Sequence, residues 1–329
     1  MAGAAGLTVV ITGPTGTFGL ALMPLLQADD QVDRVIGIAR RPFDPVERGW
    51  SKMEYRRGDV RDADALRQSF DGADVVVHLA FLILRGGRDT TRSINIDGTL
   101  NAFRAAADVG AKRFVYASSI AAYGFHSDNP IGIKEDWATR PADRLFYAQE
   151  KAELEQLLQQ EALTHPQTAL YLLRPPIVFG PDALGAKVSI PPALASVLRG
   201  AGAVLQRLPA LPVLVPDLPL QVIHQDDVAD ALRLCVLGAG APGAYNIAAD
   251  DVITGGDVAR ELGLRVVKVP ARPVAAVARA VAKLPHLPSG AQWVEAMSHP
   301  TIMDTTKAKT ELGWSPRHTA IEALRSTFR

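Results

Sequence analysis

A chain of 329 residues is long enough for one large domain with a smaller lobe, and 48% of its residues are hydrophobic, which is typical of a globular protein with a sizeable core. Its 35 basic and 35 acidic residues cancel to a formal net charge of zero, which excludes the electrostatic signature of a nucleic-acid-binding protein. The single cysteine, Cys235, allows no intrachain disulfide. The start of the chain lacks a basic leader, and four prolines interrupt the apolar stretch 204–223, so we expect a soluble, cytoplasmic protein with no membrane span.

From residue 7 to residue 174, short apolar runs alternate with amphipathic segments in the order of repeated βαβ units. The predicted strands are Leu7–Thr12, Arg34–Ala39, Met53–Arg57, Val75–Leu79, Arg113–Ala117 and Ala169–Arg174. The predicted helices are Phe18–Ala28, Ala63–Phe70, Ile94–Val109 and Phe146–Ala162. Because strands such as Val75–Leu79 are apolar without interruption, we expect burial on both faces. The sequence therefore predicts an α/β fold, a doubly wound parallel sheet between two layers of helices.

Beyond Arg174 the chain becomes rich in proline and glycine and predicts a second, smaller, mostly helical lobe. Two pieces of this part are expected to return to the first domain. They are the segment Gln221–His224 with the helix Asp226–Leu237, and the short strand Ala244–Ile247. The rest is predicted to cover the carboxyl edge of the sheet, where open α/β sheets bind their ligands.

The turn Thr12–Gly19 follows a strand and precedes an amphipathic helix, which is the context of a dinucleotide-binding loop. Gly13 permits the tight turn, Gly16 lets the backbone approach a pyrophosphate at the positive helix end, and Gly19 permits close packing of helix and strand. The residues of this turn predicted to bind a cofactor are Gly13, Thr15, Gly16, Thr17, Phe18 and Gly19.

The end of the second strand indicates which cofactor is used. An acid about 20 residues after the glycines binds the ribose 2′-hydroxyl of NAD, whereas an arginine nearby accommodates the 2′-phosphate of NADP. This chain has Ile38-Ala39-Arg40-Arg41 there, without a carboxylate. NADP is therefore favoured, with Arg40 and Arg41 at the phosphate. The alternative is that both arginines form an ordinary solvated loop and that the cofactor is NAD.

Tyr147 and Lys151 lie four residues apart on a predicted helix and so share one face. A free tyrosine, with a pKa of about 10, is a poor acid–base catalyst near neutrality, but a neighbouring ammonium lowers the phenol's pKa toward the working range. Ser119, at the end of a predicted strand, could donate to the same substrate oxygen. A Tyr and Lys pair is common on solvated helices. Together with the glycine turn and Ser119, however, it predicts an acid–base site.

These residues carry a family resemblance that extends over almost the whole chain. The chain resembles the extended short-chain dehydrogenases/reductases, which include NAD-dependent sugar-nucleotide epimerases and dehydratases. Besides the TGxxGxxG turn and the YxxxK pair, the matching segments are Gly58–Val60, His78–Ala80, Asn95–Asn101, Ser118–Gly124, Leu173–Pro181, Val222–Ala229 and Lys307–Pro316. The resemblance implies an NAD(P)-binding Rossmann domain of residues 1–174 with 221–247, and a substrate-binding lobe of residues 175–220 with 248–329.

The resemblance also implies roles for individual residues. Tyr147 would be the acid–base residue, Lys151 would bind the nicotinamide ribose, and Ser119, rather than Ser118, would orient the substrate oxygen. Asn95 is expected to support the site from behind or to cap a helix, and a homodimer through the helix that carries Tyr147 is expected. Further cofactor contacts are implied for Asp59 and Val60 at the adenine, Leu79, Ala80 and Phe81 along the cofactor, and Pro175, Ile177 and Val178 along the nicotinamide.

Two departures from the family patterns narrow the function. Dehydratases carry an Asp-Glu pair after the serine, whereas Ile120 and Ala121 follow Ser119 here, which argues against elimination of water. Epimerases typically carry an arginine four residues before the histidine that corresponds to His224, where it can clamp a nucleotide diphosphate. This chain has Leu220 at that position, and a buried sugar diphosphate would need fixed cationic partners.

The leading prediction is an NAD(P)-dependent carbonyl reductase or alcohol dehydrogenase for a compact or hydrophobic small molecule. One alternative is a nucleotide-sugar epimerase in which Arg199 or Arg207 replaces the missing arginine. Another is a cofactor-binding scaffold or sensor without turnover, against which the complete set of Ser119, Tyr147 and Lys151 argues. His78 and His224 are predicted to be structural and no metal site is expected, because His, Cys and carboxylate residues show no ligand spacing.

Overall fold

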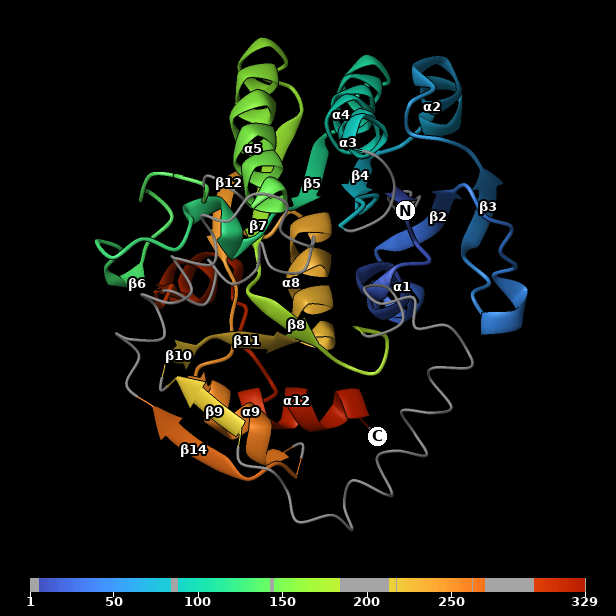
Figure 1. Cartoon of the computed structure of the whole chain (residues 1–329). Helices are drawn as coiled ribbons and strands as arrows, with labels where there is room; N and C mark the ends of the chain where they lie inside the picture. Colours follow the sequence, from blue (N-terminus) through green and yellow to red (C-terminus); the bar gives the residue numbers. More distant parts are fainter. Residues whose placement is uncertain are drawn as a thin grey trace.

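The computed structural model describes residues 6–83, 88–142, 145–183, 213–216, 218–261, 263–269 and 299–328. A seven-stranded sheet in the order β12-β7-β5-β4-β1-β2-β3 forms its centre (Figure 1), and every neighbouring pair in it is parallel. Its strands are β1 (Leu7–Thr12), β2 (Val32–Ala39), β3 (Met53–Arg57), β4 (Val75–His78), β5 (Arg113–Ala117), β7 (Ala169–Arg174) and β12 (Gly243–Asn246). The strand order reverses beside β1, so the crevice of this doubly wound sheet opens after β1 and β4.

Helices cover both faces of this sheet. Helices α2 (Ala63–Phe70), α4 (Gly98–Asp108) and α5 (Phe146–Thr164) stand together at the top of Figure 1, and α1 (Thr17–Ala28) and α8 (Gln225–Leu237) lie below them. Adjacent strand residues enter opposite layers, as the pleat requires: Val9 belongs to the cluster with α1 and α8, whereas Val10 belongs to the cluster with α2, α4 and α5. Burial on both faces explains why the strands are apolar without interruption.

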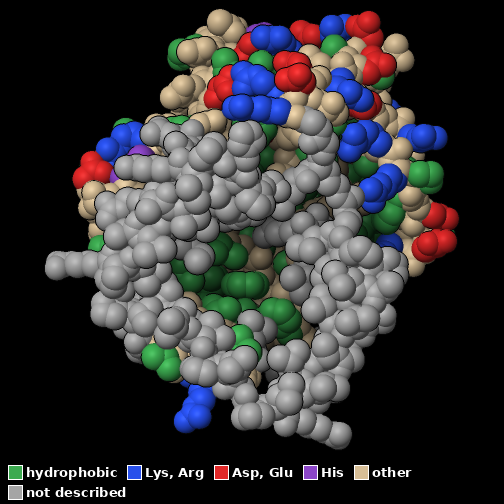
Figure 2. Space-filling model, in the orientation of Figure 1, with side chains coloured by type: hydrophobic (Ala, Val, Ile, Leu, Met, Phe, Trp, Pro, Cys, Tyr) green, Lys and Arg blue, Asp and Glu red, His purple; other side chains and the backbone are tan. Residues whose placement is uncertain are grey.

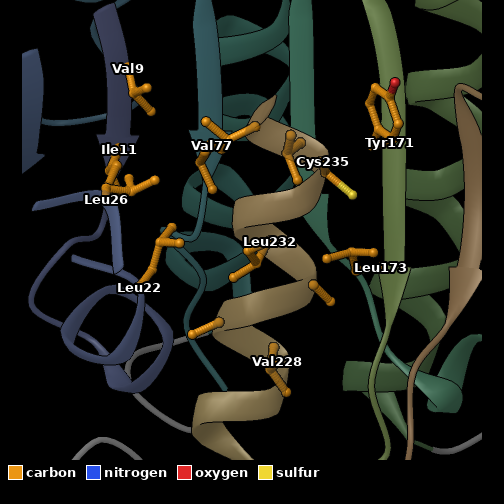
Figure 3. Close-up of a cluster of buried hydrophobic side chains, with 14 of the residues drawn as sticks. Val9, Ile11, Leu22, Leu26, Val77, Tyr171, Leu173, Val228, Leu232 and Cys235 are labelled. Atoms are coloured by element: carbon orange, nitrogen blue, oxygen red, sulfur yellow. The ribbon is translucent and has the colours of Figure 1, made fainter. Parts of the chain in front are cut away.

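The layer under α1 and α8 is drawn in Figure 3. Leu22 and Leu26 of α1 and Val228 and Leu232 of α8 meet side chains of β1, β4 and β7 there. Cys235 of α8 is buried in the same layer, and burial raises the pKa of its thiol. This cysteine is therefore a core residue and not a reactive thiol.

The predicted bounds of β1, β3, β5, β7 and α2 coincide with those of the structure. The predicted helix 94–109 differs, because it begins with a π-helical turn, η2 (Ser93–Asp97), before α4, and a short helix α3 (Arg88–Arg92) precedes that turn. Two 3-10 turns, η1 (Val46–Arg48) and η3 (Ile120–Tyr123), were not predicted.

Short strands outside the main sheet were also not predicted. They pair as β6 (Ile131–Ile133) with β15 (Ile302–Met303), β8 (Ile177–Phe179) with β11 (Val222–His224), β9 (Val213–Pro216) with β14 (Val266–Val269), and β10 (Pro219–Leu220) with β13 (Ile253–Thr254). Of the segments expected to return to the first domain, α8 covers the sheet and β12 extends it, whereas β11 pairs with β8 outside it.

The C-terminal part of the chain contains α9 (Gly255–Glu261), the π-helical turn η5 (Ala308–Leu312) and α12 (Ala320–Phe328). The turn η5 packs onto α8, whereas α9 and α12 lie against the short strands outside the main sheet. Trp314 is fully buried in the cluster that holds Leu26 and Leu232, and its indole nitrogen donates to the backbone oxygen of Asp227 at 2.9 Å. The last part of the chain thus completes the core of the first domain.

Figure 2 shows basic and acidic side chains intermixed over the end of the molecule that carries α2, α4 and α5. Within the part of the chain that the structure describes, no helix is both long and apolar enough to cross a bilayer.

Candidate active site

A cavity of about 760 Å³ opens in the crevice at the carboxyl ends of the strands. Its size falls in the range of small-molecule and cofactor sites. It brings together the glycine turn after β1, the end of β2, the segment after β4, the end of β5, the start of α5 and the turn after β7. The residues on its wall that the sequence predicted are Gly13, Thr15, Gly16, Thr17, Phe18, Gly19, Arg40, Arg41, Val60, Leu79, Ala80, Phe81, Ser119, Tyr147, Lys151, Pro175 and Val178.

Two residues expected to touch a cofactor do not line this cavity. The Asp59 carboxylate is held by Arg61, whose Nη2 lies 2.7 Å from Oδ2, and this ion pair lowers the pKa of Asp59. Ile177, in β8, is 47% exposed. Their neighbours Val60 and Val178 line the cavity, and contacts of Asp59 and Ile177 with a cofactor stay predictions.

The three glycines of the turn have different tasks. Gly13 has φ +72, and a Cβ there would lie 2.9 Å from the nitrogen of Ala80, so only glycine fits. A Cβ on Gly19 would lie 2.4 Å from the oxygen of Pro14, so Gly19 serves close packing. Gly16 has an ordinary φ of −88, and a Cβ there would meet nothing closer than the oxygen of Gly13, at 3.5 Å. The protein itself therefore does not require glycine at position 16, which faces the cavity.

Tyr147, in the first turn of α5, and Ser119, just after β5, lie on the same wall of the cavity. Burial raises the pKa of Tyr147, and a hydrogen bond with Ser119 lowers it. The Ser119 hydroxyl also accepts from the backbone nitrogen of Ala121 at 3.2 Å, which caps η3. Ser118 faces another partner, because its hydroxyl donates to Glu155 at 2.5 Å. Ser119 is thus the serine placed beside Tyr147.

Lys151 lies one helical turn after Tyr147 and is buried. Its Nζ donates to the Tyr116 hydroxyl at 3.0 Å and to the Ala117 carbonyl at 2.7 Å, and it lies 3.7 Å from the ring centroid of Phe81. Burial lowers the pKa of Lys151 to about 7, against the opposing effect of Glu155 and Glu150. The Nζ atom of Lys151 lies 5.9 Å from the Tyr147 ring centroid, and the hydrogen bond with Ser119 lowers the pKa of Tyr147. An effect of Lys151 on the pKa of Tyr147 stays a prediction.

Asn95, in the π-helical turn η2, ties the segment after β4 to helix α5. Its side chain accepts from the backbone nitrogen of Leu82 at 2.8 Å and donates to the Leu82 oxygen at 2.9 Å. It also donates to Glu150 at 2.7 Å, and burial raises the pKa of Glu150. Asn95 thus holds the strand end next to Phe81 against the helix that carries Tyr147 and Lys151, and it does so from outside the cavity wall.

A buried ion pair that was not predicted from the sequence lies behind the serines. Arg174, the last residue of β7, contacts Glu155 of α5 at 2.5 Å, with side chains 3% and 1% exposed. Arg174 also donates to the Tyr123 hydroxyl at 2.5 Å and to the Glu135 carbonyl at 3.0 Å. Through Ser118, this network joins α5, β7 and the end of β5. The sequence feature that could have indicated this ion pair is a glutamate one helical turn after Lys151 together with an arginine at the end of a predicted strand.

His78 is a structural residue, as expected. It lies between the hydroxyls of Thr12, at 2.9 Å, and Thr99, at 3.0 Å. Burial lowers the pKa of His78 to about 3, so the ring is neutral at physiological pH and packs between strand and helix.

Contrary to the sequence analysis, the fold does gather a group with metal-ligand spacing: His224, Asp226 and His318 have ligand atoms within 4.8 Å of one another. We assign the group to capping and packing. Nδ1 of His224 accepts the first-turn N–H of α8 from Asp226 at 3.2 Å, and the two imidazoles stack with centroids 4.0 Å apart. A cation there would face the positive end of α8 and compete with the cap.

The doubly wound sheet, with its glycine turn at the point where the strand order reverses, defines a dinucleotide-binding α/β protein. The sequence profile of the NAD dependent epimerase/dehydratase family matches residues 9–248. The chain belongs to this family and is therefore an NAD(P)-dependent enzyme of the oxidoreductase type.

Individual relatives extend this similarity over nearly the whole chain. The uncharacterized protein Rv0501 of Mycobacterium tuberculosis is 26% identical over 328 residues, which cover 98% of this chain and 83% of the relative. The crystal structure of gox2253 has a TM-score of 0.74 and 25% identity, covering 98% of this chain and 96% of that one. The UDP-glucose 4-epimerase of Thermotoga maritima, solved with UDP-glucose, has a TM-score of 0.71 and 21% identity, covering 98% and 97%.

Proposed function

We propose that the protein is an NAD(P)-dependent carbonyl reductase or alcohol dehydrogenase for a compact or hydrophobic substrate, with Ser119, Tyr147 and Lys151 as its catalytic residues. The observation that supports the proposal is that Ser119, Tyr147 and Lys151 all line one cavity, which also contains the glycine turn. The cavity wall includes the apolar residues Leu82, Ile83 and Pro176, and the ring of Phe81 packs against Tyr147. Such a wall favours a hydrophobic substrate over a charged one.

The residues of the cavity fit a dinucleotide. Gly16 leaves open the space that a Cβ would fill at the start of α1, where backbone N–H groups and the helix dipole favour a pyrophosphate. Leu79, Ala80 and Phe81 would lie along the cofactor, and Pro175 and Val178 would lie beside the nicotinamide. When bound, this group supplies or takes up the hydride at the substrate carbon.

The chain's own residues would move the proton. Tyr147 would donate the phenolic proton to the substrate oxygen in reduction and accept it in oxidation. Ser119, already hydrogen-bonded to Tyr147, would donate to the same oxygen and hold it in place. Lys151 would contact the nicotinamide ribose, and its ammonium would favour the phenolate form of Tyr147 as a proton leaves. Lys151 is buried and Tyr147 is partly buried, which limits access of water to this proton transfer.

We also propose a preference for NADP, because Arg40 and Arg41 follow β2 on the cavity wall. The Tyr55 hydroxyl fixes this turn by bonding to the carbonyls of Ala39, at 3.0 Å, and Arg41. Both arginine side chains are exposed, and among the residues that the structure describes neither takes part in an ion pair. Their guanidinium groups are therefore available to a 2′-phosphate, which arginine binds through paired N–H donors.

Titration calorimetry with NADP, NAD and nucleoside diphosphates tests cofactor choice and substrate class together. We expect NADP to bind at least about tenfold more tightly than NAD, because charge-assisted hydrogen bonds contribute about 1.5–3 kcal/mol. Arg41→Glu should remove this preference, while the exposed Arg48→Glu should not. We expect no binding of uridine or guanosine diphosphate. Equal affinities for NAD and NADP would refute the NADP preference.

The Gly16→Ala variant tests whether the cavity binds a dinucleotide. Alanine can adopt the backbone conformation of Gly16 and meets no steric conflict in the protein, so the melting temperature should stay the same or rise slightly. The methyl group would occupy the space needed for the pyrophosphate, and we expect the affinity for NADP to fall at least about tenfold. Unchanged affinity in a folded variant would contradict the assignment of the cofactor site.

A nucleotide-sugar epimerase is the second candidate, which the structural similarity to the UDP-glucose 4-epimerase favours. It needs a cation near the diphosphate. Leu220, where epimerases typically carry an arginine, lies in β10, and Arg199 and Arg207 lie outside the described residues. Tight binding of uridine or guanosine diphosphate in the calorimetric experiment would favour this candidate over the reductase.

A further inference from the structure

Tyr116, the penultimate residue of β5, was not singled out by the sequence, yet its hydroxyl is the side-chain partner of Lys151. Lysine has three N–H donors and no acceptor. One donor reaches the Tyr116 hydroxyl and another the Ala117 carbonyl. The Phe81 ring lies 3.7 Å from Nζ and the Tyr116 ring 4.6 Å. The ammonium is thus surrounded by aromatic residues that come from β5 and from the segment after β4.

Such surroundings favour the charged form of a lysine. An ammonium above an aromatic ring is stabilised by about 0.5–2 kcal/mol, and a hydrogen bond from a charged donor to a hydroxyl contributes more than one from a neutral amine. Both effects oppose burial, which lowers the pKa of Lys151. Without them, the buried amine would be neutral over a wider pH range.

We propose that Tyr116, assisted by Phe81, is a positioning residue that holds the Lys151 ammonium charged and directed along the cavity wall, and thereby sets the upper pH limit of catalysis. The proposal rests on the function proposed above for Lys151. Both Tyr116 and Phe81 line the cavity. Phe81 also packs edge-on against Tyr147, with ring centroids 5.7 Å apart, so the two aromatic residues connect the lysine to the proposed acid–base residue.

Other charged or titratable groups near Lys151 have different partners. On α5, Glu150 is bound by Asn95, and Glu155 is bound by Arg174 and Ser118. On β4, His78 lies between two threonine hydroxyls. These groups stay in place when the Tyr116 hydroxyl is removed, so a change in the titration of Lys151 can be ascribed to that hydroxyl.

The test is Tyr116→Phe, followed by NMR titration of protein labelled with ¹³C at lysine Cε and assigned through Lys151→Gln. In the unsubstituted protein we expect one lysine to titrate with a pKa of about 7. In Tyr116→Phe its pKa should be about one unit lower, since a charged hydrogen bond is replaced by none. The aromatic ring, which stacks near His78, remains, so we expect the fold to persist. Tyr171→Phe is the matched control, because it removes a hydroxyl that binds the Gly240 carbonyl away from the cavity.

The pH profile provides the second measurement. The alkaline limb of kcat should move about one unit toward acid in Tyr116→Phe. The rate should therefore be roughly eightfold lower at pH 7.5 but close to that of the parent protein at pH 5.5, as follows from the charged fraction of the lysine. A merely structural defect would lower the rate at every pH.

The outcomes separate the two proposals. An unchanged Lys151 titration in Tyr116→Phe overturns the inference, whatever the activity. A shifted titration in a protein that reduces no carbonyl compound overturns the proposed function but supports the role of Tyr116. If Tyr116→Phe does not fold, Phe81→Leu replaces it: the Lys151 pKa should fall in that variant too, and an unchanged pKa there overturns the inference.

Discussion

Tyr147→Phe should lower kcat by about 10²- to 10⁴-fold, the usual contribution of a positioned general acid or base, and leave the affinity for the cofactor nearly unchanged. The substitution removes the phenolic proton but keeps the ring, which contacts Phe81. It also ends the hydrogen bond with Ser119. The measurement is the rate of NADPH oxidation with a panel of hydrophobic ketones and aldehydes, together with calorimetric titration of the cofactor.

Tyr171→Phe provides the control for this experiment. Its buried hydroxyl binds the carbonyl of Gly240, so it tests whether the loss of any buried tyrosine hydroxyl lowers the rate. We expect that variant to keep its activity. A Tyr147→Phe protein that binds NADPH and turns over at the parent rate would refute the assigned mechanism. Loss of cofactor binding in Tyr147→Phe would instead indicate that the hydroxyl helps to shape the cofactor site.

The second large effect is expected on stability, at the ion pair between Glu155 and Arg174. Arg174→Met should lower the free energy of unfolding by about 3–5 kcal/mol, because it leaves an uncompensated buried carboxylate. The same substitution also leaves the Tyr123 hydroxyl and the Glu135 carbonyl without their guanidinium donor. Unfolding in urea, followed by circular dichroism, measures the change.

A double substitution distinguishes the charge from the packing at this pair. Glu155→Met combined with Arg174→Met removes both charges, and we expect it to be more stable than Arg174→Met alone. Arg233→Met is a partly exposed comparison, since Arg233 pairs with Asp29 and Asp230 near the surface, where a lost ion pair changes stability by about 1 kcal/mol or less. An effect of Arg174→Met below about 1 kcal/mol would contradict the interpretation of this network.

The regular elements of the first domain could be predicted because each has a strong local signal. Strand β1 is rich in β-branched residues and lies between glycines, and α2 follows Asp62, which caps it by accepting from the nitrogen of Ala65 at 3.0 Å. The π-helical start of α4 could not be predicted, because an apolar periodicity does not distinguish one hydrogen-bond pattern from another. Pairs such as β6 with β15 join two or three residues across more than half of the chain, and no local pattern records such partners.

The site was predictable to the extent that motifs describe it. The glycine turn, Ser119, Tyr147 and Lys151 were named from spacing, and all of them line the same cavity. The partners of Lys151 were not predictable. Tyr116 lies 35 positions away in sequence, and its place in the apolar strand β5 is typical of a core residue. The grouping of His224 with His318 likewise arises only when α12 packs against β11 and the loop before α12 packs against the start of α8.

The burial of Trp314 beneath α8 has a consequence for how the polypeptide is made. During translation the glycine turn and six strands of the main sheet are synthesised first. Helix α8, the seventh strand β12 and Trp314 follow only after residue 224. Of the helices that the structure describes, only α1 covers this side of the sheet during this interval, so the valine and leucine side chains that α8 will cover are open to water. A nascent protein in this condition is prone to aggregation, so we expect its yield in cells to depend on chaperones that shield the unfinished sheet.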